Sequence, residues 1–414
     1  MQRPPLRLAL LGSGALALTA LAAAPSSASA SPASQAKPSI ANVCGPAKAG
    51  FARCFSQVLL NPSAWRGHHA RKPSPPGGGS TTPSGYYPSD LQAAYGLANA
   101  STNYGSGVTV AIVDAYSNPY LASDLATYRN YFKLPPCTTT GCLTIVNQSG
   151  GTKLPHANSG WGTEEDLDVE MVSAICPNCN ILLVEASSNS MSNLAAAAAY
   201  AGAHANFVSN SYGSSEFSLE TSYDTYYTHT GVTYVASSGD NGYGVEYPAA
   251  SPDVVGAGGT TLNYSTSTGW SQTAWSGAGS GCSAYETKPA WQPYESNVCN
   301  DMRQVADTSA VADPNTGVAM YDTYGQSGWI VVGGTSVASP IIASVFALAD
   351  NDFGTDAAKQ LYAPTSGLTA ITLGSNGNCG NYLCNAQDSL SFNSASSYYN
   401  GPTGVGTPNG IAAF

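Results

Sequence analysis

Ser336 could act as a nucleophile, because it lies in the string GGTSVASP at residues 333–340, directly before an apolar run. The glycines permit a tight approach of the backbone, and the apolar run predicts a helix over residues 337–349. A serine in the first turn of that helix would feel the positive end of the helix dipole, which favours a developing negative charge. The alternative is an ordinary serine cap, which is common at helix starts.

A serine nucleophile needs a neighbouring base, and two carboxylates are candidates. Glu164 and Asp168 are four residues apart in the string EEDLDVE at residues 164–170. This spacing places both on one face of a helix. Like charges at this spacing repel, but the pair can coexist by sharing a proton, which separates its two pKa values. The alternative is a solvated acidic first turn, which the helix dipole also favours.

A third carboxyl lies in the string YVASSGDNG at residues 234–242. The pattern predicts a strand that runs into a glycine-rich turn carrying Asp240. A protonated carboxyl at this position could donate a hydrogen bond to the oxyanion of a tetrahedral intermediate. The alternative is an aspartate that only shapes the turn.

The strings E-x-x-L-D, S-S-G-D-x-G and G-T-S-x-A-S-P occur here in the order found in sedolisins, the serine-carboxyl peptidases, and over residues 86–414 the chain resembles that family. The resemblance implies that Ser336 is the nucleophile, Glu164 the general base, Asp168 the acid that supports it and Asp240 the oxyanion acid. It also implies a subtilisin-like fold, peptide-bond hydrolysis and an acidic working pH. Shorter matching stretches are YPSDL at 87–91, SNSYG at 209–213, YPAAS at 247–251, GGTT at 258–261 and GPTGVGTP at 401–408. From the second stretch we expect Ser209, Asn210, Ser211 and Gly213 to bind substrate.

A conventional subtilisin is the alternative peptidase. Subtilisins introduce their catalytic histidine with a His-Gly-Thr string, which this sequence lacks. Asp114 ends the first expected strand where a subtilisin would keep its catalytic aspartate, but without a histidine we expect it to be structural. His156, near Trp161, is expected in a cleft or on the surface.

The resemblance has two departures. Sedolisins usually carry a much longer folded prosegment than the roughly fifty residues available here. They also hold Ca²⁺ near the C-terminus with an Asp-Ile pair and a later Asp, where this chain has Ala370-Ile371 and Asn400. A hard cation prefers charged oxygens, so we expect no metal and no other cofactor. Asp388 is the alternative calcium ligand.

The remaining sequence predicts strands that alternate with helices. Strands are expected at 108–113, 181–184, 207–211 and 232–236, and helices at 167–174, 193–205 and 337–349. Such alternation predicts an α/β fold of three layers, in which a mainly parallel central sheet has helices on both faces. The sites of such sheets lie at the carboxyl ends of the strands.

The N-terminus reads as an export signal over residues 1–30, with Arg3 and Arg7 before an apolar stretch and a small-residue cleavage site at 28–30. A membrane anchor is the alternative. Residues 31–80 read as a short propeptide that ends in a Pro/Gly linker, or else as a disordered mature N-terminus. The peptidase domain is expected over 81–414, with the active chain beginning between about 74 and 86.

The ten cysteines form five close pairs, and in an exported chain an even count implies disulfides, although spacing alone does not fix the connectivity. Cys176 and Cys179 could also be read as a redox or zinc motif. The formal net charge of −11 makes nucleic acid an unlikely partner. We therefore expect a secreted, monomeric endopeptidase acting on proteins or peptides, with a catalytically silent binding protein on the same fold as the alternative.

Overall fold

The computed structural model describes residues 38–70, 82–293, 295, 298–351, 353–363, 366–392 and 397–414. All of them belong to one contact unit, residues 36–414. The expected signal peptide and the Pro/Gly stretch at 71–80 lie outside the described residues.

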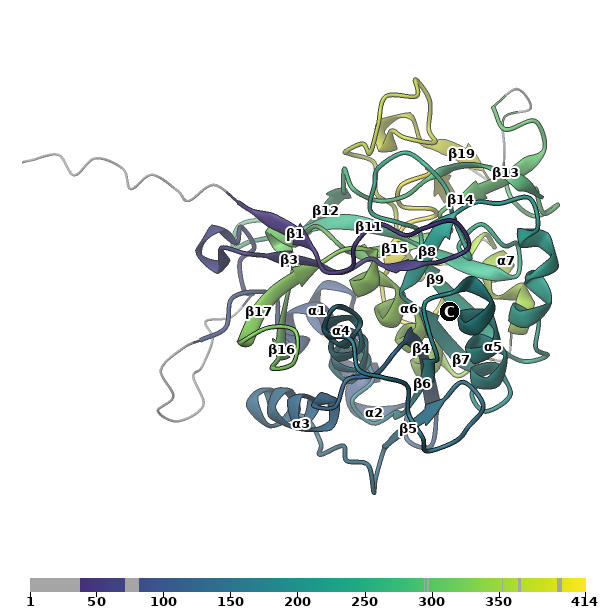
Figure 1. Cartoon of the computed structure of the whole chain (residues 1–414). Coiled ribbons are helices and arrows are strands. Elements are labelled where there is room, and N and C mark those ends of the chain that lie inside the picture. Colours follow the sequence, from purple (N-terminus) through teal and green to yellow (C-terminus); the bar gives the residue numbers. More distant parts are fainter. Residues whose placement is uncertain are drawn as a thin grey trace, which may run out of the picture. The chain divides into compact units, whose positions relative to one another are not determined.

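A mainly parallel sheet forms the centre of this unit (Figure 1). Its strands follow the spatial order β12-β11-β9-β7-β4-β6-β5, and β15 also pairs with β11. Every neighbouring pair is parallel except β11 and β12. The bounds are β4 Thr109–Ala115, β5 Leu143–Asn147, β6 Asn180–Ala186, β7 Phe207–Asn210, β9 Thr233–Ser237, β11 Val254–Ser265, β12 Gly269–Ala274 and β15 Thr308–Val311.

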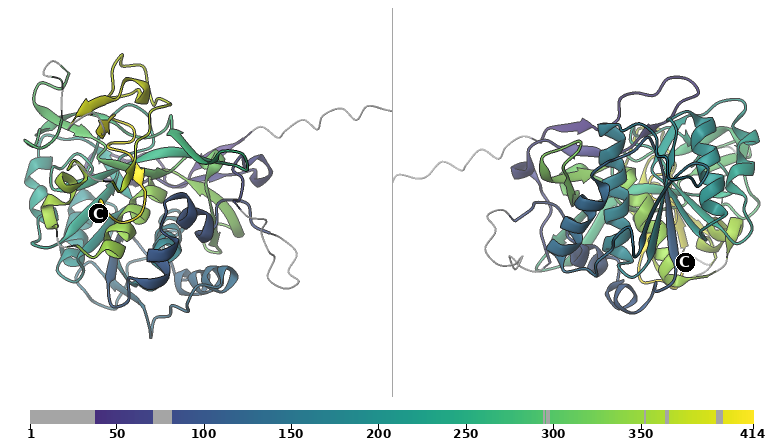
Figure 2. Two further views of the ribbon diagram at one scale, coloured as in Figure 1. Left: turned by 180° about the vertical axis from the view of Figure 1, so that it is seen from behind. Right: turned by 60° about the horizontal axis from the view of Figure 1, so that its bottom comes forward.

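Helices cover both faces of this sheet (Figure 2). They are α1 Pro88–Ala94, α2 Ala98–Asn103, α3 Leu121–Phe132, α4 Ser159–Ile175, α5 Met191–Gly202, α6 Thr335–Ala349 and α7 Ala357–Leu361. Alternate residues of β4 pack on opposite faces of the sheet, against different helices. Val110 and Ile112 pack in the cluster that contains α4 and α6, whereas Ala111 and Val113 pack in the cluster that contains α5. A strand buried on both faces needs a continuous apolar run, as this one has. The expected three-layer α/β fold is confirmed.

Residues 38–70, which the sequence suggested to be a propeptide, contain three short strands. They are β1 Ile40–Asn42, β2 Arg53–Cys54 and β3 Gln57–Leu59. β3 pairs antiparallel with both β1 and β17 Gly328–Gly333, which in turn pairs with β16 Val318–Asp322. β2 pairs antiparallel with β8 Tyr212–Ser215, whose other neighbour is β10 Glu246–Tyr247. This N-terminal segment therefore joins the body at two separate edges (Figure 1).

The remaining strands form three small pairs: β13 Gly281–Thr287 with β14 Met302–Val305, β18 Leu368–Thr369 with β21 Thr407–Pro408, and β19 Leu390–Phe392 with β20 Ser397–Tyr399. The five disulfides join the close pairs that spacing suggested: Cys44–Cys54, Cys137–Cys142, Cys176–Cys179, Cys282–Cys299 and Cys379–Cys384. Cys176 and Cys179 thus bond to each other. Over the described ranges, none of the helices combines the length and the apolar character that crossing a bilayer requires.

Candidate active site

Ser336 is the second residue of α6 and is fully buried. Gly334 caps the helix with a φ of +99°, a conformation that favours glycine. This sharp turn brings the end of β17 directly into the helix and holds Ser336 over the ends of the parallel strands. Its hydroxyl donates to the carbonyl oxygen of Ser211, just past the end of β7, at 3.2 Å.

Glu164 and Asp168 come from α4, which begins five residues before Glu164. Asn158 caps the start of this helix: its side-chain oxygen accepts a hydrogen bond from the backbone N–H of Trp161 at 3.1 Å. Glu164 therefore lies beyond the first turn and is fully buried, as is Asp168. The solvated acidic first turn that the sequence left open does not form.

Burial controls the protonation of this pair. It raises the pKa of Glu164 to about 7, and the neighbouring polar groups of Ser336 and Ser56 offset part of the rise. Burial also raises the pKa of Asp168 well above its usual value, with the charge of Glu164 adding to the effect and the Ser211 hydroxyl, 2.8 Å from Oδ1, opposing it. Within the described chain, Glu164 Oε1 and Asp168 Oδ2 have no hydrogen-bond partner. A shared proton would satisfy both oxygens.

Asp240 follows β9 and reaches the start of α6. Its Oδ1 accepts hydrogen bonds from the backbone N–H and the hydroxyl of Thr335, both at 2.8 Å. Its Oδ2 is buried and finds no partner among the described residues. Burial raises the pKa of Asp240 to about 8 despite the Thr335 bonds and the nearby charge of Arg53. Because Oδ1 is already occupied as an acceptor, a proton on Asp240 would lie on Oδ2, where it makes that oxygen a neutral donor.

The four expected substrate-binding residues separate into two kinds. Ser209 and Asn210 are buried: the Ser209 hydroxyl bonds to that of Ser339, and the Asn210 amide donates to the carbonyl of Val235. Ser211 and Gly213 instead face another strand, because Gly213 pairs with Arg53 of β2 and the Ser211 carbonyl accepts from the backbone N–H of Phe55.

No histidine contacts Ser336 in the part of the chain that the structure describes. His156 is exposed and packs on the ring of Tyr116. The others are His68, which is exposed, His69, which pairs with Asp90, His204, which contacts the carbonyl of Tyr200, and His229, which contacts the hydroxyl of Tyr234.

Asp114, the alternative catalytic aspartate, lies at the end of β4 among the same carboxyl groups. Burial raises its pKa well above the usual value, and the charges of Asp168 and Glu164 add to this. It therefore belongs to the electrostatic surroundings of Asp168 rather than to a histidine.

Residues that the sequence did not single out also line the site. The backbone N–H of Phe55 donates to Ser336 Oγ at 3.1 Å, and the N–H of Ser56 donates to Glu164 Oε2 at 3.0 Å. The signal that could have found them is the run FSQVLL at 55–60 directly after Cys54, which has the apolar content of a strand rather than of a linker.

The positions of the family's calcium site do not fit a cation. Asn400 is buried, and its Nδ2 donates to the carbonyl oxygen of Ile371 at 2.9 Å. Its Oδ1 accepts from the backbone N–H and the hydroxyl of Thr403, which fixes the orientation of the amide. An N–H group of Asn400 therefore points at the carbonyl of Ile371, and Ala370 offers no side-chain ligand. Asp388 accepts a hydrogen bond from Asn385 instead.

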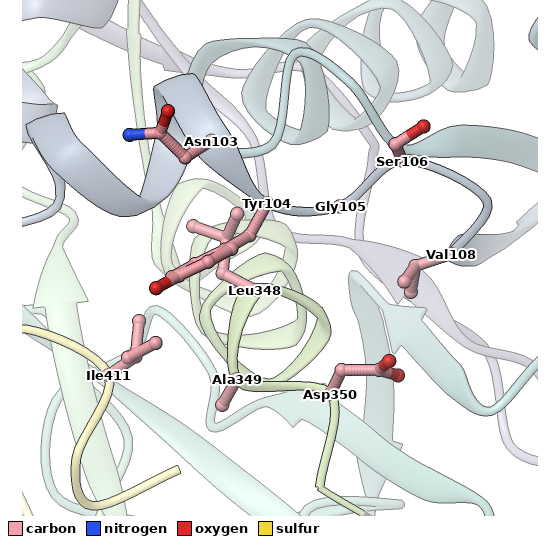
Figure 3. A pocket seen from close by; sticks show the side chains of 9 residues that line it. All are labelled: Asn103, Tyr104, Gly105, Ser106, Val108, Leu348, Ala349, Asp350 and Ile411. Atoms are coloured by element: carbon pink, nitrogen blue, oxygen red, sulfur yellow. The ribbon is translucent and has the colours of Figure 1, made fainter.

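Two cavities lie near α6. One of about 180 Å³ is lined by residues next to Asp240, including Ser238 and Gly239, and by Glu246 of β10. Figure 3 shows the other, of about 470 Å³, whose lining includes Leu348 and Ala349 at the last turn of α6. Thirteen residues of helix put Ser336 about 20 Å from that turn, so the second cavity is separate from the site.

Five acidic residues of α4 are fully buried: Glu164, Glu165, Asp166, Asp168 and Glu170. Burial raises the pKa of each, and neighbouring carboxylates raise most of them further. The folded protein therefore keeps protons that the unfolded chain releases above about pH 4.5. This contribution to stability is fully present in acid and is lost as the pH rises through the folded-state pKa values.

We expect the melting temperature to fall from pH 4 to pH 8. Each such group lowers the free energy of unfolding by about 1.4 kcal/mol per pH unit within its window. Differential scanning calorimetry across this pH range measures the melting temperature. Glu170→Gln removes one of these groups, and should flatten the dependence. A melting temperature that rises toward pH 8 would contradict the argument.

The sequence and the fold of this chain are similar to those of known proteins. The sequence model of the subtilase family matches residues 147–379, which include Ser336, Glu164, Asp168 and Asp240. Sedolisin of Pseudomonas sp. (strain 101) is 38% identical over 28% of this chain and 24% of its own length. Kumamolisin of Bacillus sp. (strain MN-32) is 27% identical over 66% of this chain and 54% of its own length. The chain thus spans about half or less of the length of these relatives.

A solved structure of Pseudomonas sedolisin, described as a serine-carboxyl proteinase complexed with pseudo-iodotyrostatin, has the same fold. It aligns with a TM-score of 0.65 and 24% identity over 80% of this chain and 96% of that one. Together with the family match, this places the chain in the subtilase family, as a sedolisin-like protein with a subtilisin-like fold.

Proposed function

We propose that this chain is a secreted serine-carboxyl endopeptidase that hydrolyses peptide bonds at acidic pH. The observation that carries the proposal is that two carboxyls with pKa values raised by burial lie at the start of α6, Glu164 beside Ser336 and Asp240 on its neighbour Thr335. One can accept a proton and the other can donate a hydrogen bond, which are the two tasks of acyl transfer from a peptide.

The chemistry follows from these positions. Ser336 Oγ attacks the peptide carbonyl while Glu164 takes its proton, and Asp168 tunes Glu164 through the shared charge. Asp240 Oδ2 and the backbone N–H of Ser336 stabilise the oxyanion. Glu164 then gives the proton to the leaving amine, and water releases the acyl group by the same steps.

The test is cleavage of a peptide library by the purified full chain after incubation at pH 4, assayed from pH 3 to pH 8. Cleavage should occur in acid and decline toward neutrality. A catalytically silent binding protein is the second candidate, because the chain's own N-terminal segment lies against the site. Absence of cleavage at every pH would favour it.

Export and the monomeric state remain part of this proposal. Five disulfides form in the structure, and such bonds persist in oxidising compartments. The proposed substrates are proteins or peptides, without nucleic acid or membrane. Detection of the protein in the culture medium, and its mass by light scattering, test the two points.

We also propose that no calcium binds at the family's position in this chain, because the Asn400 amide joins the two positions that a cation would join in the family. The melting temperatures in EDTA and in millimolar Ca²⁺ should agree within about 1–2 °C, since a ligand that does not bind the native state gives no stabilisation. A large drop in EDTA would mean that other oxygens form a site.

A further inference from the structure

The N-terminal segment is held on both of its edges where it approaches the proposed active site. On one edge β2 pairs antiparallel with β8, with Arg53 opposite Gly213. On the other edge the backbone N–H of Ala52 donates to the carbonyl oxygen of Asn189 at 2.8 Å. The side-chain amide of Asn189 donates back to the carbonyl oxygen of Ala52 at 2.6 Å. One residue therefore binds both polar groups of the Ala52 main chain.

The position of Asn189 along the groove follows from the register of the segment. The nitrogen of Phe55 lies 3.1 Å from Ser336 Oγ, and Ala52 precedes Phe55 by three positions. Counted from the residue beside Ser336, Ala52 is the fourth residue on the acyl side. A substrate whose main chain followed the same groove would bring its own fourth residue to Asn189, well away from the reacting bond. A main-chain contact of this kind gives affinity without regard to side chains.

The groove continues past Ala52 in the N-terminal direction. Phe51 forms an antiparallel bridge with Ser190, and the backbone N–H of Met191 donates to the carbonyl oxygen of Gly50 at 3.0 Å. Residues 45–50 are exposed. The segment thus runs through the groove and out to solvent, so the groove admits a polypeptide that extends beyond the fourth residue on the acyl side.

Tyr116 fixes the orientation of the Asn189 side chain. Its hydroxyl donates to Asn189 Oδ1 at 2.9 Å, which leaves Nδ2 of the same amide to face Ala52. The Tyr116 ring packs on the rings of His156 and Trp161, with centres 4.9 and 6.4 Å away. Tyr116 has a φ of +71°, which is uncommon for a residue other than glycine. Such a conformation persists only where its surroundings hold it, and it often marks a functional position.

We propose that Asn189 binds the substrate main chain at the fourth residue on the acyl side, and that Tyr116 positions Asn189 for this contact. This rests on the proposed function. Every polypeptide carries the N–H and C=O groups that Asn189 binds, so the contact selects for chain length and not for a side chain. A peptide whose free N-terminus lies at the third residue leaves Asn189 without this partner. The site therefore favours internal bonds of polypeptides over a bond three residues from an N-terminus.

The experiment offers two peptides together to the purified full chain after incubation at pH 4. Ac-Ala-Arg-Ser-Phe-Ser-Gln reaches Asn189, whereas Arg-Ser-Phe-Ser-Gln ends in a free amine one residue earlier. Mass spectrometry follows cleavage of the Phe–Ser bond in both. In competition, the ratio of the two kcat/KM values does not depend on the fraction of enzyme whose site is free. Wild type should cut the longer peptide about tenfold faster, as the loss of two neutral hydrogen bonds predicts.

Three variants assign this ratio to a residue. Asn189→Ala should lower the ratio about fivefold while the ratio of the two kcat values stays the same, because the contact contributes to binding alone. Tyr116→Phe keeps the ring packing and removes only the hydroxyl, so it should shift the ratio in the same direction by a smaller factor. Asn193→Ala is the matched control, because the side chain of Asn193 bonds to Ser188 and Gln148 and not to the segment. It should behave as wild type.

The outcomes separate this inference from the proposed function. Equal cleavage of the two peptides by wild type, or faster cleavage of the shorter one, would overturn the inference and leave the proposed function standing. The same holds if Asn189→Ala and Asn193→Ala change the ratio alike, since the effect would then come from a loosened loop. If neither peptide nor an unrelated protein is cut at any pH, the proposed function fails and the inference fails with it.

Discussion

Replacing Ser336 with alanine is expected to abolish peptide hydrolysis while the protein stays folded. A serine that acts as one unit with its base contributes about 10⁶ in kcat, because neither group works alone. The change removes one hydroxyl whose hydrogen bonds go to Ser211 and Phe55. The Phe55 N–H keeps the Ser211 carbonyl as a second acceptor, so the loss of stability should stay small.

Ser339→Ala is the matched control for this change. Ser339 lies one turn further along α6, is equally buried and bonds to Ser209 and the carbonyl of Val235. It should retain most of the activity, whereas Ser336→Ala should retain none above background. Initial rates on a peptide substrate at pH 4, with circular dichroism to verify folding, compare the two. Full activity in Ser336→Ala would remove the central assignment.

The sequence was informative where a short string determines both structure and chemistry. The alternation of apolar strands and helices predicted a parallel sheet, and the strands at 207–211 and 232–236 appear in the structure as β7 and β9. The ends of parallel strands and the start of α6 meet at one edge of such a sheet. Ser336 and Asp240 could therefore be expected together, whereas Glu164 and Asp168, which lie on α4, were joined to them by the resemblance to sedolisins.

The position of the N-terminal segment could not be predicted in this way. Phe55 and Ser336 are separated by 281 positions in the chain, and nothing in a local pattern indicates which edge a short strand will join. The composition of residues 31–80 resembles a linker as a whole, although the part at 38–70 forms strands. Only the close cysteine pair and the apolar residues after it distinguish that part.

The burial of α4 could not be predicted from the sequence either. The string EEDLDVE has the composition of a solvated helix, and its polar residues show no separate buried face. Burial becomes understandable only with the surrounding contacts: Asn118 donates to Asp166, and the backbone N–H of Tyr321 donates to Glu170. These donors come from distant parts of the chain.

Asp240 variants should change both the rate and its dependence on pH. Asp240 must carry a proton to donate to the oxyanion, so kcat/KM should fall as this proton is lost. The pKa of about 8 belongs to the site with Phe55 and Ser56 in place. A substrate that takes the place of these residues and admits water would lower the desolvation that raises this pKa. The alkaline decline should therefore lie between about pH 4 and pH 8.

A comparison of Asp240→Asn with Asp240→Ala distinguishes the loss of the hydrogen-bond donor from the loss of the ionisable carboxyl group. In Asp240→Asn the amide oxygen can accept the two Thr335 bonds that Oδ1 accepts now. Its NH₂ then takes the place of Oδ2 and stays a neutral donor at every pH. This variant should lose less activity than Asp240→Ala, which loses about 10²–10³ in kcat with the donor, and its alkaline decline should be shallower. Profiles of kcat/KM from pH 2.5 to pH 8 decide this. A wild-type optimum at pH 8 that disappears on replacing His156 would instead indicate an imidazole base, which titrates near neutrality.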